Sequence, residues 1–321
     1  MEALPSPSDG ITSLTWSAND VLVATSWDCE VRAYGVQTSG IKALASHSHS
    51  APVLCSAVTP NEVLSGGCDT SVAAWDVETG SVRSVGSHLA PIKGLVYVDE
   101  VNAAVSGSWD STLKHWDLRS SAPVHDLVLP QRTFCMDAVF PLLAVGCAER
   151  QVVLFDLRKP SEPLRHSLSP LKYQTRSIAV FTDGSGYTLG SIEGRVAVQH
   201  VEEKESNFNF VFKCHRHSNN IYAVNAIAFH PVFGTFATAG SDGQYAFWDQ
   251  YSKQRLTQGP SQNDAISAAA FSNDGTYFAY GVSYDWHRGS EFYNPDSSSN
   301  SIIVERVSPS VIKPRQRETQ V

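Results

Sequence analysis

Residues 69–76 read DTSVAAWD and residues 110–117 read DSTLKHWD. Each stretch begins with Asp, has an aliphatic residue three positions later, and ends in Trp-Asp. The same spacing recurs from Asp242, with Tyr245 in the aliphatic position. Weaker copies begin at Asp28, Glu149 and Glu193. Successive copies begin 41, 41, 39, 44 and 49 residues apart, so one structural unit is repeated along the chain.

A repeat of about 40–45 residues with this signature is typical of the WD repeat, in which each unit forms one four-stranded blade of a propeller. Short runs of β-branched and aromatic residues alternate with turn residues, and no long window has helical periodicity. We therefore predict an all-β protein, a seven-bladed WD-repeat β-propeller. The predicted repeats are 11–45, 46–86, 87–125, 126–166, 167–204, 205–258 and 259–308, the last from spacing alone.

The predicted domain organisation follows from this repeat, because a closed ring of blades is one domain. We expect a short N-terminal lead over 1–10, a single propeller over 11–307 and a disordered tail over 308–321. The ring must close by sharing strands between its two termini, which removes open sheet edges. The polar stretch 283–300 is expected to be an enlarged loop, and the sequence assigns it no role.

Composition narrows the class of function. The net charge of −8 argues against binding of nucleic acid through the overall charge of the protein, so any contact with RNA would be local and secondary. No apolar stretch of about 18 residues is present, so we expect no membrane insertion. The six cysteines contain no CxxC pair, and we expect reduced thiols, no metal site and no cofactor.

Several conspicuous residues have structural explanations. His49 and His88 are expected to hydrogen-bond the turn Asp of a blade, and Trp75, Trp116 and Trp248 are expected in blade cores. The cluster Cys214-His215-Arg216-His217 lacks the second ligand pair that a metal site needs. Phosphate-binding, nucleophile-elbow and zinc-protease motifs are missing. The sequence therefore predicts a protein that is not an enzyme, with no catalytic residues.

Basic and aromatic residues at strand ends are the candidate binding residues. Arg176 lies near the start of the fifth repeat, Arg195 follows a tight turn, and Arg216 lies in the next segment. Trp27 and Trp109 each come just before a turn Asp. Two interpretations of these tryptophans stay open: they are exposed on one face of the ring, or they cap a neighbouring blade.

The segments KYQTR at 172–176, IEGRVAV at 192–198 and FKCHR at 212–216 resemble one WD-repeat family almost throughout the chain. Its two branches are the mitotic-checkpoint protein Bub-three and the messenger-RNA export factor Rae-one, called Gle-two in yeasts. The early start of the first repeat and Tyr173 favour the checkpoint branch. The stretch SYDWHRGSEFYNP at 283–295 and Ala-Glu-Arg at 148–150 favour the export branch. On balance we expect the checkpoint branch.

The resemblance implies a spindle-checkpoint adaptor that binds a GLEBS-type peptide of a checkpoint kinase or its relative, and phosphorylated repeats of a kinetochore scaffold. Its implied location is the nucleus, and the kinetochore in mitosis, as a monomeric ring. The alternative is a nuclear-pore mRNA export factor that binds the GLEBS motif of a nucleoporin. In both, Arg195 and Arg216 would pair with acidic residues of the peptide. Trp27, Trp109 and Arg176 would lie beside them, and no residue is assigned to a phosphate.

Overall fold

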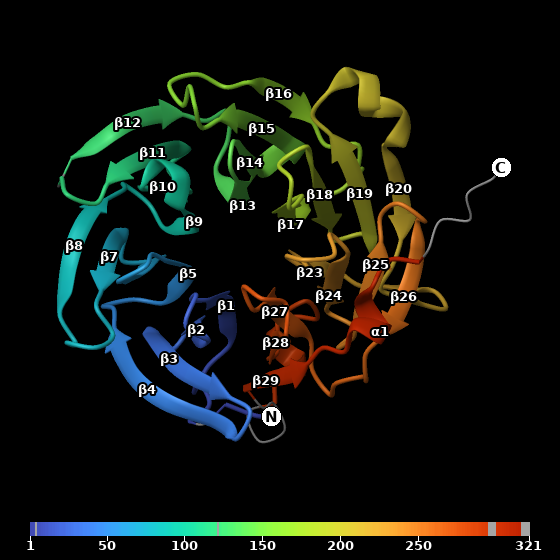
Figure 1. Cartoon of the computed structure of the whole chain (residues 1–321), viewed down its shortest axis with the longest axis horizontal. Helices are drawn as coiled ribbons and strands as arrows, with labels where there is room; N and C mark the ends of the chain where they lie inside the picture. The colour runs from blue at the N-terminus through green and yellow to red at the C-terminus, as the bar shows by residue number, and fades with distance from the viewer. Residues whose placement is uncertain (4, 121, 295–299, 316–321) are drawn as a thin grey trace.

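In the computed structural model, the described residues are 1–3, 5–120, 122–294 and 300–315. They form seven antiparallel sheets, the blades, arranged in a ring around a central axis (Figure 1). The all-β, seven-bladed WD-repeat propeller is therefore confirmed.

The strands have the following bounds. The innermost strands are β1 Ile11–Trp16, β5 Val53–Val58, β9 Ile92–Val98, β13 Thr133–Val139, β17 Thr175–Val180, β23 Val224–Phe229 and β27 Ile266–Phe271. The second strands are β2 Val21–Ser26, β6 Val63–Gly67, β10 Ala103–Ser108, β14 Leu142–Cys147, β18 Gly186–Ser191, β24 Phe236–Gly240 and β28 Tyr277–Val282. The third strands are β3 Glu30–Gln37, β7 Ser71–Trp75, β11 Thr112–Asp117, β15 Gln151–Asp156, β19 Arg195–His200, β25 Tyr245–Asp249 and β29 Ser301–Arg306.

The outermost strands are β4 Gly40–Ser48, β8 Val82–Ser87, β12 Pro123–Val128, β16 Arg165–Leu168, β20 Phe210–Lys213 and β26 Gln254–Gln258. A short hairpin, β21 Arg216–His217 and β22 Asn220–Ile221, joins blades five and six. The described helices are short: η1 Asp99–Val101, η2 Ala148–Arg150, η3 Glu203–Phe208, η4 Ser290–Phe292 and α1 Pro309–Ile312.

The hydrophobic core lies between neighbouring blades. Each inner strand is covered on both faces, so its apolar residues need not alternate with polar ones; β14 is buried throughout. Trp75 and Trp116 are fully buried, as predicted. Trp248 is only partly buried, although its indole Nε1 donates a hydrogen bond to Thr238 Oγ1 at 2.9 Å.

A hydrogen-bonded network orders the turn between the second and third strands. In blade three, His88 Nε2 lies 2.7 Å from Ser106 Oγ, and His88 Nδ1 lies 3.2 Å from an Asp110 carboxylate oxygen. The Trp116 indole donates to the same Ser106 oxygen at 2.7 Å. In blade two His49 contacts Asp69 at 2.8 Å. The predicted role of His49 and His88 is therefore confirmed.

The N-terminal residues complete the seventh blade, which otherwise has the three strands β27, β28 and β29. Val304 N donates to Met1 O at 2.7 Å and Ala3 N donates to Ile302 O at 2.9 Å. The Ala3 side chain is fully buried. The predicted lead over 1–10 thus includes a segment that pairs with β29, because an open edge on β29 would leave backbone groups unpaired.

The C-terminal segment differs from the predicted disordered tail of 308–321. Helix α1 packs on blade six with the Ile312 side chain fully buried. Thr235 Oγ1 donates to Ile312 O at 2.9 Å, and Thr257 Oγ1 donates to Val311 O at 3.1 Å. The apolar pair Val311-Ile312 explains this ordered turn. Residues 316–321 lie outside the described part of the chain, and there the tail stays a prediction.

The boundary between blades five and six also differs from the predicted one. Strand β20 pairs with β19 in antiparallel register, with Val196 opposite Phe212. Residues 210–213 therefore belong to blade five rather than to the predicted repeat 205–258. The weak copy at Glu193 hides this, because the intervening segment with η3 lengthens the repeat.

Candidate functional site

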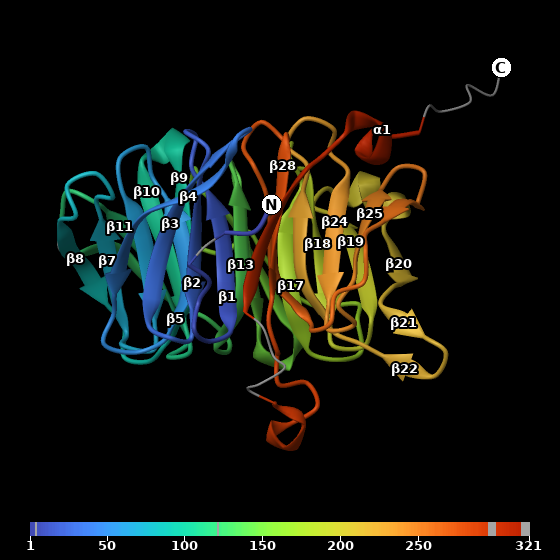
Figure 2. The same ribbon diagram turned by 90° about the horizontal axis from the view of Figure 1, so that it is seen from below.

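One face of the ring collects the candidate binding residues. Because neighbouring strands are antiparallel, the start of each innermost strand and the turn between second and third strands lie at the same end of the blade. We call this end the mouth face. In Figure 2 it points downward, and the β21–β22 hairpin and the loop that follows β28 project from it.

A β-bulge in each innermost strand shapes the centre of the mouth face. In β1, Ile11 lies opposite Ser26 and Ser13 opposite Thr25, so Thr12 has no partner in β2. All seven innermost strands have this extra second residue, and bulges re-aim side chains. We call these residues the mouth ring; they are Thr12, Leu54, Lys93, Phe134, Arg176, Asn225 and Ser267.

The mouth ring lines a cavity of about 400 Å³ at the opening of the central channel. Trp27, Trp109 and Trp286 line the same cavity from the turns after β2, β10 and β28. Their exposed fractions are 43%, 39% and 46%. The structure therefore favours the first interpretation of Trp27 and Trp109: both are exposed on one face, where a ligand can contact them.

Backbone hydrogen bonds fix these two tryptophans. Trp27 N donates to Gly10 O at 2.9 Å, and Trp109 N donates to Pro91 O at 2.9 Å. The turn after Trp27 is rigid as well, because Arg32 binds Asp28 at 2.8 Å. Burial alone would raise the pKa of Asp28, but hydrogen bonds from Arg32 and Ser26 hold it at about 2. The turn is thus ordered before any ligand binds.

Arg195 and Arg216 lie away from the mouth ring, where they meet at the turn between β18 and β19. Arg195 Nε lies 3.3 Å from a Glu193 carboxylate oxygen. Arg216 donates to the backbone oxygens of Glu193 at 2.6 Å and Gly194 at 3.2 Å. Arg216 is therefore part of the local structure as well as a candidate contact.

The five predicted site residues thus form two groups on one face. Trp27, Trp109 and Arg176 lie at the channel mouth, and Arg195 with Arg216 lies on blade five and the hairpin beside it. The sequence missed Lys93 and Trp286. Lys93 is the second residue after Pro91, as Leu54 is the second residue after Pro52. This repeated position is the sequence pattern that could have pointed to Lys93.

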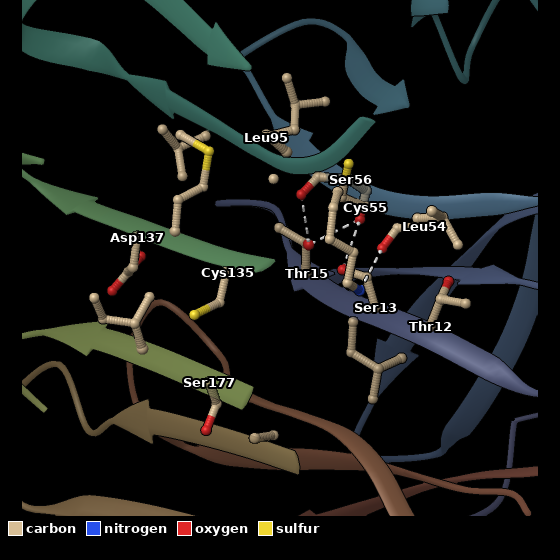
Figure 3. A pocket seen from close by; sticks show the side chains of 18 of the residues that line it. Thr12, Ser13, Thr15, Leu54, Cys55, Ser56, Leu95, Cys135, Asp137 and Ser177 are labelled. Carbon is tan, nitrogen blue, oxygen red and sulfur yellow. Dashed lines mark hydrogen bonds between the residues drawn. The ribbon is translucent and has the colours of Figure 1, made fainter. Parts of the chain in front are cut away.

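The channel below the mouth is polar. Ser13, Thr15 and Ser56 hydroxyls are linked by hydrogen bonds, and Figure 3 shows them across the cavity from Asp137. An Asp137 carboxylate oxygen accepts from Val180 N of the next blade at 2.7 Å. Burial raises the pKa of Asp137 to about 6.

The candidate metal cluster around His215 has a structural explanation. His215 Nδ1 lies 2.8 Å from Asp242 and Nε2 lies 2.9 Å from Thr238 Oγ1, so both ring nitrogens are used within blade six. Among the described residues no group of three His, Cys, Asp or Glu side chains is placed to hold a metal ion. None of the helices in the described ranges is long and apolar enough to cross a bilayer.

The ring of antiparallel blades and the arrangement of its mouth face together define the class of this protein as a WD-repeat propeller. The WD domain, G-beta repeat family matches residues 2–34, 80–117 and 207–249. Protein RAE1 of Arabidopsis thaliana is 48% identical over 98% of this chain and 93% of its own length. The Poly(A)+ RNA export protein of Schizosaccharomyces pombe is 41% identical over 99% of this chain and 93% of its own length. The mRNA export factor of Xenopus tropicalis is 38% identical over 99% of this chain and 92% of its own length.

The chain therefore belongs to the RAE1 and GLE2 family of WD-repeat mRNA export factors. The preference for the checkpoint branch, and the spindle-checkpoint function that it implied, was wrong, because near full-length relatives that are 38–48% identical are named RAE1, poly(A)+ RNA export protein and mRNA export factor. Tyr173, interpreted as a checkpoint-like feature, pointed to the wrong branch. The export-like stretch within 283–295 was the better discriminator, and its described part lies in the loop that projects from the mouth face.

Proposed function

We propose that this protein is a non-catalytic mRNA export factor of the nuclear pore, which holds a GLEBS-type segment of a nucleoporin across the mouth face. The names of its relatives support a role in export. The single observation that carries the binding site is the gathering of Trp27, Trp109 and Trp286 on the face that also presents Arg176, Arg195 and Arg216.

Aromatic and arginine side chains are the residue types that most often dominate the binding energy of an interface. The three tryptophans supply apolar surface, and backbone hydrogen bonds fix the turns of Trp27 and Trp109, so little conformational entropy is lost there when a peptide binds. The guanidinium groups can each donate two hydrogen bonds to a carboxylate. An acidic segment with apolar residues between its carboxylates fits this arrangement.

The molecular test is a calorimetric titration of the purified chain with a GLEBS-type nucleoporin segment. We expect Arg195→Glu and Arg216→Glu to weaken binding at least tenfold, because each replaces an attraction to a carboxylate with a repulsion. Lys159→Glu is the matched control, since Lys159 is exposed at the end of β15 opposite the mouth face. Circular-dichroism melts check that each variant is folded. If Arg216→Glu destabilises the β18–β19 turn, the result for Arg195→Glu decides the test.

The cellular test is replacement of the protein by the Arg195→Glu variant. The proposal predicts loss of the protein from the nuclear rim and accumulation of poly(A)+ RNA in the nucleus, while Lys159→Glu restores both. If cells lacking the protein keep a normal distribution of poly(A)+ RNA, the assignment to export is wrong. Unchanged peptide binding by folded Arg195→Glu and Arg216→Glu would instead reject the two arginines as contacts.

A further inference from the structure

Two cations of the mouth ring face the channel opening without a counterion. Lys93 comes from blade three and Arg176 from blade five, and both line the cavity of about 400 Å³. Lys93 Nζ has one long contact, 3.5 Å from Leu54 O. Arg176 Nε donates to Asn225 Oδ1 at 3.2 Å. Within the described ranges, neither side chain lies within ion-pair distance of a carboxylate.

Asp285 lines this cavity and Asp137 lines the channel below it, and both carboxylates are already engaged. Asp285 accepts hydrogen bonds from Asn225 at 2.8 Å and from Ser241, and it lies 2.6 Å from His287 Nδ1. Asp137 lies deeper in the channel wall, where it accepts from Val180 N. Both carboxylates therefore satisfy groups of their own blade or of an adjacent blade rather than neutralising the two cations.

Two like charges that line one cavity repel each other, and Lys93, which is partly buried, also loses hydration, whereas Arg176 is exposed. Both effects cost free energy unless an anion is bound. The environment of Lys93 agrees with this: burial lowers the pKa of its ammonium group, and the positive charge of Arg176 acts in the same direction. An anion seated between the two side chains would remove both penalties.

We propose that the channel mouth is a binding site for a compact phosphate-bearing small molecule, held between Lys93 and Arg176. A phosphate group brings a charge near −2 and three acceptor oxygens, which matches two cations better than the single charge of a carboxylate does. Thr12, Ser267 and the Asn225 amide line the same cavity and offer further polar groups. This proposal does not depend on the proposed function.

The test is calorimetric titration of the full chain with inorganic phosphate, pyrophosphate and inositol hexakisphosphate, at constant ionic strength set with chloride. We expect saturable binding of at least one of these probes with a stoichiometry near one. Lys93→Met and Arg176→Met should each weaken that binding at least tenfold. Lys159→Met, the same substitution at an exposed position away from the channel, should leave it unchanged.

Three outcomes would overturn the proposal. The first is that none of the three probes binds saturably. The second is that Lys93→Met and Arg176→Met, both folded by circular dichroism, bind as tightly as the parent. The third is that a phosphoserine peptide binds while all three small probes fail, which would assign the site to a protein ligand. Because no nucleoporin segment is present in this titration, failure leaves the proposed function untouched.

Discussion

Lys93 and Arg176 occupy the same position, the bulged second residue of an innermost strand, in two blades that are separated by one other blade. Each blade contributes one such residue to the mouth ring. The repeated backbone therefore fixes where seven side chains meet, while the residue type at each place is free to vary. The chemistry of the channel opening is set by these seven choices rather than by any change of fold.

Replacing the exposed tryptophans tests whether they are binding contacts. We expect Trp27→Ala and Trp109→Ala each to weaken binding of the nucleoporin segment by about 1–3 kcal/mol, because buried aromatic anchors carry much of the energy of an interface. The measurement is calorimetry with the purified variants. Val124→Ala, at an exposed apolar position near the start of β12 and at the opposite end of the blade from the mouth face, should have no effect. Changes below twofold for both tryptophans would reject them as anchors.

The His88 network predicts a specific loss of stability. Ser106→Ala removes the oxygen that His88 Nε2 contacts and that the Trp116 indole donates to. Buried groups left without a partner cost about 1–3 kcal/mol each, so we expect the free energy of unfolding to fall by about 2–4 kcal/mol. Urea denaturation measures this. Ser84→Ala, on the exposed outer strand β8, should change little, and equal effects would contradict the account.

Closure of the ring by the N-terminal residues predicts sensitivity at Ala3. Ala3→Glu places a carboxylate where the native side chain is fully buried against blades one and seven. We expect a loss of at least about 2 kcal/mol in unfolding free energy, since burying an unpaired charge is strongly unfavourable. The comparison is Ala122→Glu, the same change at an exposed position. Identical melting temperatures for the two variants would show that the N-terminal segment does not hold blade seven.

Asp137 predicts a pH dependence of stability. Its folded pKa of about 6 lies above the ordinary value, so between about pH 4 and 6 the folded protein binds more protons than the unfolded chain does. The Asp137 carboxyl therefore makes its full contribution to the free energy of unfolding below about pH 4. This contribution is lost as the pH rises through 6. We expect Asp137→Asn, whose amide oxygen can still accept from Val180 N, to be more stable than the parent at pH 7.5 by about 1–3 kcal/mol.

Unfolding in urea at pH 4 and pH 7.5 checks this prediction. The advantage of Asp137→Asn should vanish at pH 4, where the parent carboxyl is neutral. Asp183→Asn, at an exposed turn, serves as the matched change. A constant difference between Asp137→Asn and the parent at the two pH values would show that the Asp137 carboxyl does not titrate in this window.

The sequence predicted the fold well because the repeated element is local. The Trp-Asp spacing fixes a turn and a strand within eight residues, and His88 lies close enough in the repeat pattern to be matched with Asp110. The β19–β20 pairing was missed because η3 separates the two strands. Closure of the ring by its two termini was expected, but residues 1–3 were assigned to a separate lead because their partner strand is about 300 residues away. Such long-range pairings leave no local pattern.

The candidate site was predicted in part. Trp27 and Trp109 were found because each is a large aromatic residue just before a turn Asp, at the end of a strand. Lys93 and Trp286 were missed, since a mouth-ring position is recognisable only once the bulges and the loop after β28 are seen together. The branch of the family was wrong because Tyr173 was given more weight than the export-like stretch 283–295.

The most direct measurement is hydrogen–deuterium exchange of the full chain with and without the GLEBS-type nucleoporin segment. The account predicts slower exchange on the mouth face, at residues 27–29, 109–111, 192–195 and 216–222. Turns at the opposite end of the blades, such as 183–185, should exchange at unchanged rates. Slower exchange at those opposite turns or on the outermost strands, with no change at the tryptophan turns, would show that the segment binds elsewhere and contradict the central claim.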